Sequence, residues 1–465
     1  MDSKYKKLKT NTLLMLISNF SSKVLVFLLI PLYTHCLSTK EYGISDIIFT
    51  TANLVYPIFT LLMTEAILRF TLDNNTKSEN DSIFSIAIFI SVIGFIILLL
   101  VGPLIANLLH IGNYIIYFYL YYLSTIVYFL FSQFTKGMGK VKEFAISGLI
   151  NTIVTIICNV FMLVFLNLKI SGYILSYVIG MLVASIYLFF KVNLRSYFIN
   201  IKKIDRKKTK EMLLYSIPMI PNSISWWISN SSDKYILSIF KDLSETGIYS
   251  ASYKIPTLLT TFSNVFVGSW QLSSVDEFGS EESINFHKNV YLKYSTIVTV
   301  SVVWLIFLSK LISKFLFSAE YYSAWEPAII LLFAFLFNTL SGFLGTIYTS
   351  AKKTFYLFLS TLIAAILNII CNIIFIPKFG MVGAAFATLI SYFFVWFFRI
   401  INTRKILDMH LNLTNDFIAY LFIITEIVLM LLNYNMIFVF LIPVIITILN
   451  RKNIKIFFLS ILNKK

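Results

Sequence analysis

The sequence predicts an all-α polytopic membrane protein with about fourteen transmembrane helices, arranged as two related six-helix lobes and two further C-terminal helices. Three observations lead to this fold class: the hydrophobic composition, the alternation of basic loops along the chain, and a polar pattern that occurs twice. Of the 465 residues, 58% are hydrophobic and 13% are charged. Soluble domains carry about 25% charged residues, so the composition excludes that class.

The apolar runs set the number of spans. A helix of about 20 apolar residues crosses the hydrocarbon core of a bilayer, and the chain contains fourteen such runs. They lie at 11–34, 44–70, 82–108, 113–135, 144–166, 171–191, 212–240, 247–272, 291–317, 326–350, 355–376, 382–402, 414–432 and 434–450. No small-residue cleavage site follows the first run, so we expect it to stay in the protein as a transmembrane helix.

The connecting loops alternate between basic and nearly neutral. Loops on the side of the N-terminus carry 28 lysines and arginines, and loops on the opposite side carry six. Because loops rich in lysine and arginine stay in the cytoplasm, both termini are expected there. The net charge of +16 therefore follows from membrane topology, and we expect no nucleic-acid partner.

A polar pattern in the second span returns in the eighth. Successive members of each set are four, three, four, three and four positions apart. Adding 204 to each residue number of the first set gives the positions of the second set. The first set is Asp46, Thr50, Asn53, Pro57, Thr60 and Thr64, and the second is Ser250, Lys254, Thr257, Thr261, Asn264 and Gly268. Six spans separate the copies, so both run in the same direction across the membrane. A parallel duplication of this kind predicts a pseudo-two-fold axis along the membrane normal and a central cavity between the lobes.

The duplication also predicts the domain organisation. The motif IICN, which ends at Asn159 in the fifth span and at Asn372 in the eleventh, supports a repeat of six spans. We expect the following ranges: a six-helix lobe at 1–192, a basic cytoplasmic linker at 193–211, a second six-helix lobe at 212–403, and two extra spans with a basic cytoplasmic tail at 404–465.

The eighth span is the main candidate for the lining of a transport pathway. Its polar set, extended by Gln271, lies on one helical face because steps of three and four residues return to the same side. A charge near the middle of the bilayer costs about 2.5 kcal/mol or more, so the face with Lys254 must meet protein or a water-filled cavity. For the small polar residues, the alternative is interhelical hydrogen bonding within a packed bundle. The lysine favours the cavity.

Other charged and amide side chains lie inside the predicted spans. Asn19 and Lys23 share one face of the first span. The seventh span has a polar face that includes Asn222, Asp233 and Lys234. We expect these side chains to face the cleft between the lobes, because ionisable groups inside a membrane rarely face lipid. A structural cap or pair at the outer end of the span is the alternative for Asp233 and Lys234.

Two more features near span ends have a structural and a functional interpretation. Glu65 and Arg69 lie four residues apart near the cytoplasmic end of the second span, where a local ion pair is the simpler interpretation. Trp226 and Trp227 are either sugar-stacking residues or part of the interfacial aromatic belt. For Trp270 we expect the belt.

The sequence contains no pattern that indicates catalysis or a metal site. Its three cysteines and four histidines are scattered without metal-binding or redox spacing. It also lacks a nucleotide-binding loop of the GxxxxGK[ST] type and a nucleophile elbow. We therefore expect no enzymatic activity and no cofactor, so that any transport draws on a gradient, the membrane potential or the removal of the cargo.

Several segments resemble a known family. They are PLYTHCLSTKEYGISDI after the first span, ILRF at the end of the second, SIPMIPNSISWWISNSSDKYILSIF and GIYSASYKIP in the seventh and eighth, and NIICNIIFIPKFGMVGAAFATLIS in the eleventh and twelfth. These segments resemble the polysaccharide or O-antigen flippases of the Wzx type, in the multidrug/oligosaccharidyl-lipid/polysaccharide exporter superfamily. The resemblance covers nearly the whole chain.

The resemblance implies two six-helix bundles that alternate access between the two membrane faces. The implied cargo is an undecaprenyl-diphosphate-linked oligosaccharide repeat unit, moved from the cytoplasmic to the outer leaflet of the bacterial inner membrane for surface polysaccharides such as lipopolysaccharide O-antigen or capsule. Membrane lipids, a polysaccharide polymerase and chain-length machinery are the partners that it implies.

If the cargo is a lipid-linked oligosaccharide, as the resemblance implies, the candidate site residues fall into three groups. Cations for the diphosphate are Lys23, Lys254, Lys234 and Arg69; polar groups for the glycan are Asn19, Asn53, Asn222 and Asn264; acidic residues for ion coupling are Asp46, Glu65 and Asp233. A flippase for lipid II is a close alternative. A drug or cation antiporter of the same superfamily would need a more anionic cavity, and a glycan polymerase or ligase would need large outer loops that this chain lacks.

Overall fold

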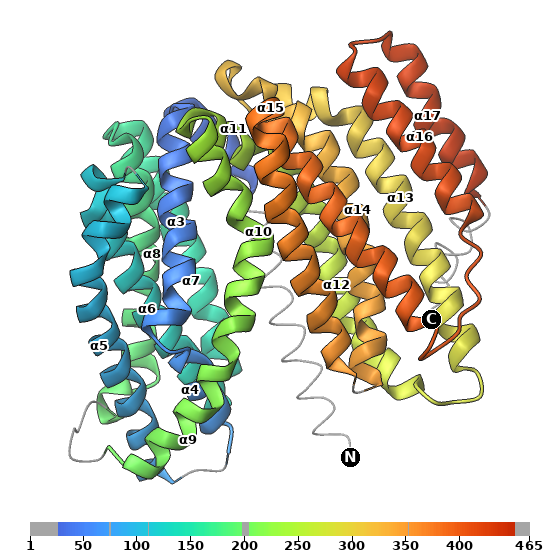
Figure 1. Ribbon diagram of the computed structural model, residues 1–465. Helices are drawn as coiled ribbons and strands as arrows, with labels where there is room; N and C mark the ends of the chain where they lie inside the picture. The colour runs from blue at the N-terminus through green and yellow to red at the C-terminus, as the bar shows by residue number, and fades with distance from the viewer. Residues whose placement is uncertain (1–26, 74–75, 110, 198–203, 352, 452–465) are drawn as a thin grey trace. The chain divides into compact units, whose positions relative to one another are not determined.

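The computed structural model describes residues 27–73, 76–109, 111–197, 204–351 and 353–451 (Figure 1). All regular secondary structure in these ranges is helical, so the predicted all-α class is confirmed. The chain divides into two compact units, Met1–Ile228 and Ser229–Lys465.

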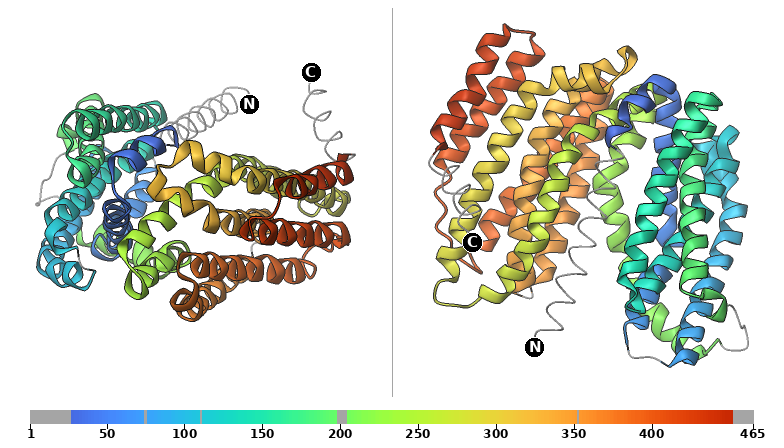
Figure 2. Two further views of the ribbon diagram at one scale, coloured as in Figure 1. Left: turned by 90° about the horizontal axis from the view of Figure 1, so that it is seen from above. Right: turned by 180° about the vertical axis from the view of Figure 1, so that it is seen from behind.

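Unit 1 consists of helices packed roughly side by side, as Figures 1 and 2 show. They are α2 (Ile30–Cys36), α3 (Thr39–Phe59), α4 (Met63–Thr71), α5 (Lys77–Leu108), α6 (Ile115–Gly137), α7 (Val141–Val160), α8 (Lys169–Lys191) and α9 (Arg206–Ser216). α3 and α5 each begin with a capping box, in which Ser38 pairs with Glu41 and Thr76 pairs with Glu79. These caps satisfy the free N–H groups of the first turn and fix where the two helices begin.

Unit 2 contains the helices of the second half of the chain. They are α11 (Leu243–Ser252), α12 (Lys254–Glu277), α13 (Ser283–Leu316), α14 (Trp325–Ser350), α15 (Thr354–Thr403), α16 (Thr414–Leu431) and α17 (Met436–Leu449). The boundary between the units falls inside α10 (Ile220–Phe240), which belongs in part to each. The predicted domain ranges, with a linker at 193–211, stay a prediction.

The C-terminal pair α16 and α17 packs against α13 in unit 2, as both views in Figure 2 show. Ser295 in the first half of α13 donates a hydrogen bond of 2.6 Å to Asp416. Nearer the C-terminal end of α13, the ammonium group of Lys310 donates to Asn433 at 2.7 Å and lies 4.3 Å from the ring centre of Trp325. Polar contacts therefore hold the C-terminal pair against α13 at two separate levels.

The lengths of the helices agree with the predicted spans. In the described part of the chain, eight helices are long and apolar enough to cross a membrane, or nine if α3 and α4 form one bent span. α15 has 50 residues in two helical halves that meet at a kink at Gly380, and the two halves supply two predicted spans. The first predicted span, 11–34, lies mostly outside the described residues.

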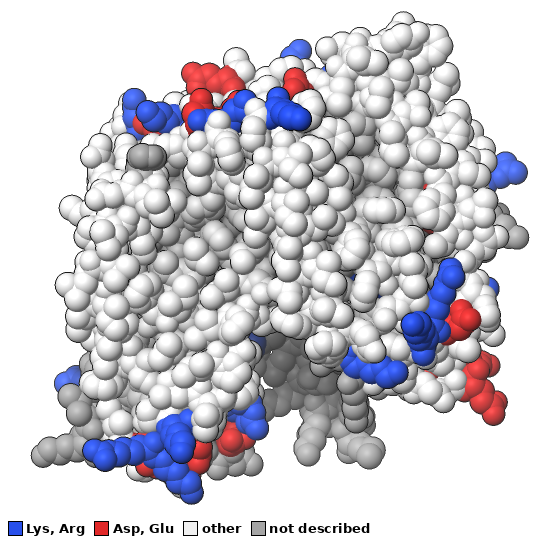
Figure 3. Space-filling model, in the orientation of Figure 1, with Lys and Arg blue, Asp and Glu red and all other residues white. Residues whose placement is uncertain are grey.

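On the face of unit 1 shown in Figure 3, charged side chains lie at the two ends of the helices and leave an uncharged band between them. This band is the surface expected of helices that cross the hydrocarbon core. α10 and α12 have 21 and 24 residues and are long enough to cross a membrane, but they are not among the eight helices that are also apolar enough. Both carry predicted pathway residues.

Two helices break at defined positions. Leu61 and Leu62 both have left-handed backbone angles, with φ of 47° and 51°, and α3 and α4 meet there at a bend of 61°. α15 changes direction at Gly380, where φ is 54° and ψ is −133°. The Glu245 carboxylate accepts a hydrogen bond of 3.2 Å from the N–H of Met381, and so caps the second half of α15.

Candidate functional site

The polar row of α12 lies on a different face from the residues that pack α12 into unit 2. On the packed face, Trp270 donates a hydrogen bond of 2.9 Å to Thr346, and Ser274 bonds to His287 at 3.0 Å. Ile255 and Leu259 are buried on the same side. Among the described side chains, the opposite face of α12 is exposed at Thr257, Asn264 and Gln271.

The polar row itself is open to the surface of unit 2. Thr257, Asn264 and Gln271 are exposed, and Lys254 and Thr261 are half-buried. The hydroxyls of Thr257 and Thr261 donate to backbone carbonyls of α12 itself, at 2.8 Å each. The sequence left open that these polar side chains form hydrogen bonds between helices. The bonds of Thr257 and Thr261 instead stay within α12. In a membrane, such a face must meet water or polar groups.

Lys254 begins α12, after an interruption of one residue at Tyr253. Pro256 follows two positions later and has no N–H, so it cannot donate to the carbonyl of Ser252, four residues before it. The positive side chain of Lys254 therefore lies in a helical turn whose backbone hydrogen bonding is incomplete. An arrangement of this kind is suited to a polar ligand and poorly suited to lipid.

Asp233 lies at the centre of a hydrogen-bond network that joins α10 to α11. One carboxylate oxygen accepts bonds from the hydroxyls of Tyr249, at 2.7 Å, and Tyr253, at 2.6 Å, and the other accepts from the backbone N–H of Lys234, at 2.9 Å. The side chain of Asp233 is 2% exposed. The Lys234 ammonium lies 5.4 Å from the ring centre of Tyr253, a cation–π contact. This geometry supports the predicted structural pairing, and the ion-coupling role stays a prediction.

The matching polar row in unit 1 is mostly buried. Thr50, Thr60 and Thr64 are buried, whereas Asn53 is exposed and Asp46 is half-buried. The Thr60 hydroxyl donates to the carbonyl of Tyr56 at 2.7 Å, and the hydroxyl of Tyr56 donates to Thr64. The two copies of one sequence pattern therefore have different exposure, although their spacing is the same.

Trp227 contacts the same row from α10. Its indole N–H donates a hydrogen bond of 2.8 Å to the carbonyl of Thr50, within unit 1. Trp226 is exposed, as is Asn222 one turn earlier on α10. The two adjacent tryptophans thus have different surroundings, and the exposed Trp226 is the one open to a sugar ring or to the interface.

The ion pair predicted between Glu65 and Arg69 is wrong. Within the described residues, Arg69 pairs with Asp73 at 2.9 Å, and both side chains are exposed. Asp73 lies in the turn after α4, where it is one helical turn beyond Arg69 and closer to solvent. Lys23 and Asn19 lie outside the described residues. Arg69 and Glu65 lie on α4, in unit 1, and Lys254 and Asn264 lie on α12, in unit 2.

Residues 8–270, more than half of the chain, match the family described as polysaccharide biosynthesis protein. The chain belongs to this family.

Relatives of this chain include a protein of Haloferax volcanii described as a probable low-salt glycan biosynthesis flippase, Agl15. The two are 26% identical over 262 residues, which cover 55% of this chain and 54% of the relative. Two uncharacterized membrane proteins of Methanocaldococcus jannaschii also match. MJ1375 is 25% identical over 85% of this chain and 98% of its own length, and MJ1068 is 28% identical over 45% of each. The matches to Agl15 and MJ1068 thus span about half the length of those relatives.

Solved structures with this fold are membrane transporters. The lipid II flippase MurJ, in an inward closed conformation, matches with a TM-score of 0.71 and 20% identity over 95% of this chain and 100% of its own. An inward-facing multidrug resistance transporter of the MATE family, in the MOP superfamily, matches with a TM-score of 0.66 and 13% identity over 84% of this chain and 93% of its own. At these identities the likeness shows the fold. Together with the family match, it supports a multi-pass membrane protein.

Some features of the structure were not predictable from spacing. Arg399, which lies in the predicted span 382–402, is only 7% exposed on α15. Its guanidinium donates to the carbonyl of Ser341 at 2.8 Å and to the hydroxyls of Ser360 and Thr361 at 3.1 and 3.2 Å. These acceptors compensate for the cost of burying the Arg399 guanidinium.

The belt position predicted for Trp270 is also wrong. Its indole stacks on the ring of Phe343, with the ring centres 4.6 Å apart, and the residue is buried. Sequence position near a span end does not reveal which way the helix turns its indole. The buried face of α12, once counted in steps of three and four from Ile255, does include position 270 and could have indicated this.

Proposed function

We propose that this protein is a flippase for an oligosaccharide linked to a polyprenyl diphosphate. The observation that carries the proposal is the row on α12 that begins at Lys254 and continues through exposed Thr257, Asn264 and Gln271. The family match and the flippase among the relatives support the same class of cargo.

The chemistry of this row suits the two polar parts of such a cargo. An ammonium group attracts phosphate oxygens without a fixed bidentate geometry, which allows the diphosphate to slide along the site. Amide and hydroxyl side chains exchange hydrogen bonds with sugar hydroxyls. The polyprenyl tail remains in the lipid, so the protein has to provide a polar path only for the headgroup.

The other candidate residues extend the proposal beyond α12. Lys23, Lys234 and Arg69 are the further cations for the diphosphate. The further polar groups for the glycan are Asn19, Asn53 and Asn222, and the acidic residues for ion coupling are Asp46, Glu65 and Asp233.

The finer parts of the proposal concern cargo and location. We place the protein in the bacterial cytoplasmic membrane with both termini in the cytoplasm, and assign it an undecaprenyl-diphosphate-linked repeat unit. Such a flippase would feed a polymerase and chain-length machinery that build a surface polysaccharide. It would act by binding and conformational change, without covalent chemistry.

A gene deletion with complementation tests the proposal. Loss of the protein should leave lipid-linked repeat units on the cytoplasmic leaflet and reduce surface glycan. Lys254→Ala or Lys23→Ala should fail to restore surface glycan, whereas Lys241→Ala should restore it, because Lys241 is exposed between α10 and α11, outside the polar row. If no lipid-linked intermediate accumulates in the deletion strain, the flippase function is wrong. If both lysine variants restore the glycan at normal protein levels, the site is wrong.

Lipid II is the second candidate cargo, because the fold matches the lipid II flippase over nearly the whole chain. Lipid II also joins a polyprenyl tail to sugars through a diphosphate, so the cationic row suits it equally. The same deletion strain separates the two. Accumulation of lipid II and loss of wall synthesis would identify lipid II, whereas loss of surface glycan with normal wall synthesis would identify the oligosaccharide carrier.

A further inference from the structure

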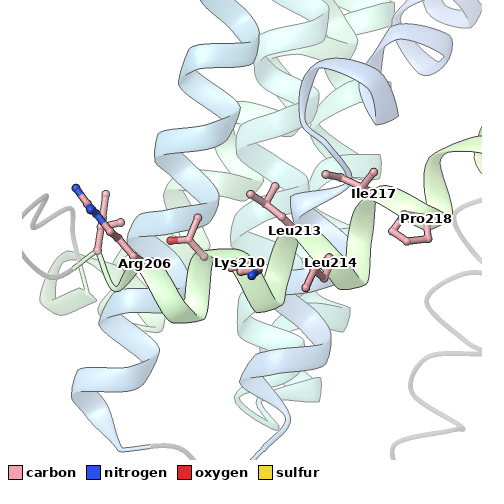
Figure 4. Close-up of a pocket in the computed structure, with 8 residues that line it drawn as sticks. Arg206, Lys210, Leu213, Leu214, Ile217 and Pro218 are labelled. Carbon is pink, nitrogen blue, oxygen red and sulfur yellow. The ribbon is translucent and has the colours of Figure 1, made fainter.

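A surface groove of about 440 Å³ runs beside α9 in unit 1 (Figure 4). Its walls include Arg206, Lys210, Leu213, Leu214, Ile217 and Pro218. Figure 4 shows the two cationic residues toward one end of the row and the apolar residues toward the other. The groove is therefore cationic at the start of α9 and apolar at its end.

The order of residues in α9 explains this arrangement. Arg206 and Lys210 are one turn apart, and Leu214 follows one turn later, so all three lie on one side of the helix. Leu214 is 65% exposed and Ile217 is 45% exposed. α9 packs against α4 and α5 through its other side, where Met212 and Ser216 are buried. The exposed leucine and isoleucine are thus not required for packing within unit 1.

A second hollow beside α9 is lined by both acidic and basic residues. It is lined by Glu79, Asp205 and Glu211 together with Lys207 and Lys208, so its charges nearly cancel. Lys208 lies 3.7 Å from Glu211, and the Asp205 carboxylate accepts from the N–H of Lys207. By contrast, the residues that the structure describes around the apolar groove include no acidic side chain, and within the same described ranges Arg206 and Lys210 form no ion pair.

We propose that this groove binds an anionic membrane phospholipid. Arg206 and Lys210 hold the phosphate headgroup, while Leu213, Leu214 and Ile217 contact the first part of an acyl chain. Charge complementarity favours this occupant: two cations without a carboxylate suit a phosphate, and an adjoining exposed apolar strip suits a lipid chain at the interface. The site is separate from the polar row of α12 and does not depend on the proposed cargo.

Native mass spectrometry of the purified full-length protein in neutral detergent can measure this binding. The probes are a phosphatidylglycerol and a phosphatidylcholine with identical acyl chains. We expect a saturable phosphatidylglycerol adduct that weakens with added salt, and no matching phosphatidylcholine adduct. The double variant Arg206→Gln/Lys210→Gln should bind phosphatidylglycerol about 30-fold more weakly, as expected for two basic residues near a membrane surface.

The matched control is Lys142→Gln/Arg195→Gln, which removes one lysine and one arginine from exposed positions in the same unit. It should bind phosphatidylglycerol as the unaltered protein does. Leu214→Gln/Ile217→Gln keeps both cations and should also weaken the adduct, because the exposed apolar strip is lost. Equal adducts with both lipids, equal losses in the two charge variants, or unchanged binding in Leu214→Gln/Ile217→Gln would each overturn the proposal.

Discussion

The carboxylate of Asp233 accepts a hydrogen bond of 2.7 Å from the hydroxyl of Tyr249, sixteen residues further along the chain. The bond crosses from α10 to α11, and the hydroxyl of Tyr253 donates to the same oxygen. A buried carboxylate with three donors is well satisfied, so removing it leaves buried hydroxyls without an acceptor.

Asp233→Ala should therefore lower the free energy of unfolding by about 2–4 kcal/mol, whereas Asp233→Asn, which keeps the shape and one acceptor oxygen, should cost less. Thermal unfolding of the detergent-purified variants measures the difference. Transport by Asp233→Asn with and without an ion gradient then tests coupling. A well-folded Asn variant with an unchanged gradient dependence would rule Asp233 out as the coupling residue.

The two faces of α12 should respond differently to substitution. Asn264→Leu on the exposed row should reduce transport severalfold and leave thermal stability nearly unchanged, because Asn264 is exposed. Trp270→Phe on the packed face should lower stability by about 1 kcal/mol, because its hydrogen bond to Thr346 is lost. Both variants are measured for surface glycan and for melting temperature. A large loss of stability in Asn264→Leu would contradict the assignment of that face to a polar path.

Gly380 should be intolerant of a side chain. A Cβ atom there would lie 2.5 Å from the Glu245 carboxylate that caps the second half of α15, and its φ of 54° is unfavourable for other residues. We expect Gly380→Ala to lower the free energy of unfolding by roughly 1–3 kcal/mol. Gly342→Ala is the control, because a Cβ atom there meets no atom within 4 Å. Equal melting temperatures for the two variants would show that the kink is not constrained.

The buried Arg399 should contribute more to stability than an exposed arginine nearby. Arg399→Leu leaves the carbonyl of Ser341 and two hydroxyls without their donor, and should cost about 1–3 kcal/mol. Arg404→Leu, at an exposed position just after the end of α15, should change the free energy of unfolding by less than about 0.5 kcal/mol. Thermal unfolding of both variants provides the comparison, and a destabilised Arg404→Leu would point to general loss of surface charge instead.

Most predicted spans after the first coincide with one described helix, with the bent pair α3 and α4, or with a half of α15, whereas the spans at 212–240 and 247–272 each cover two helices, α9 with α10 and α11 with α12. This agreement has a simple cause: the thickness of the bilayer sets the length of an apolar run, and a run is local in sequence. The repeated asparagines of IICN are also alike in the structure, since Asn159 and Asn372 are both fully buried.

The polar spacing that the two repeats share does not predict where their helices are interrupted. In unit 1 the break follows Pro57 at Leu61 and Leu62, and in unit 2 the interruption at Tyr253 precedes Pro256. These prolines are not equivalent under the shift of 204 residues, which relates Pro57 to Thr261. The same stripe of polar residues therefore stands on helices that are interrupted at different depths.

Sequence alone determined that this protein is a helical membrane protein with a duplicated polar stripe, because helix length and the steps of three and four residues depend only on neighbours along the chain. Tertiary structure decided what each polar residue does. Asp233 is enclosed by tyrosines that follow it in the chain, and Arg399 by acceptors 38 to 58 residues away, whereas Thr257, Asn264 and Gln271 in the row from Lys254 are exposed. Such differences arise from packing between segments distant in sequence, which the spacing of residues within one helix does not encode.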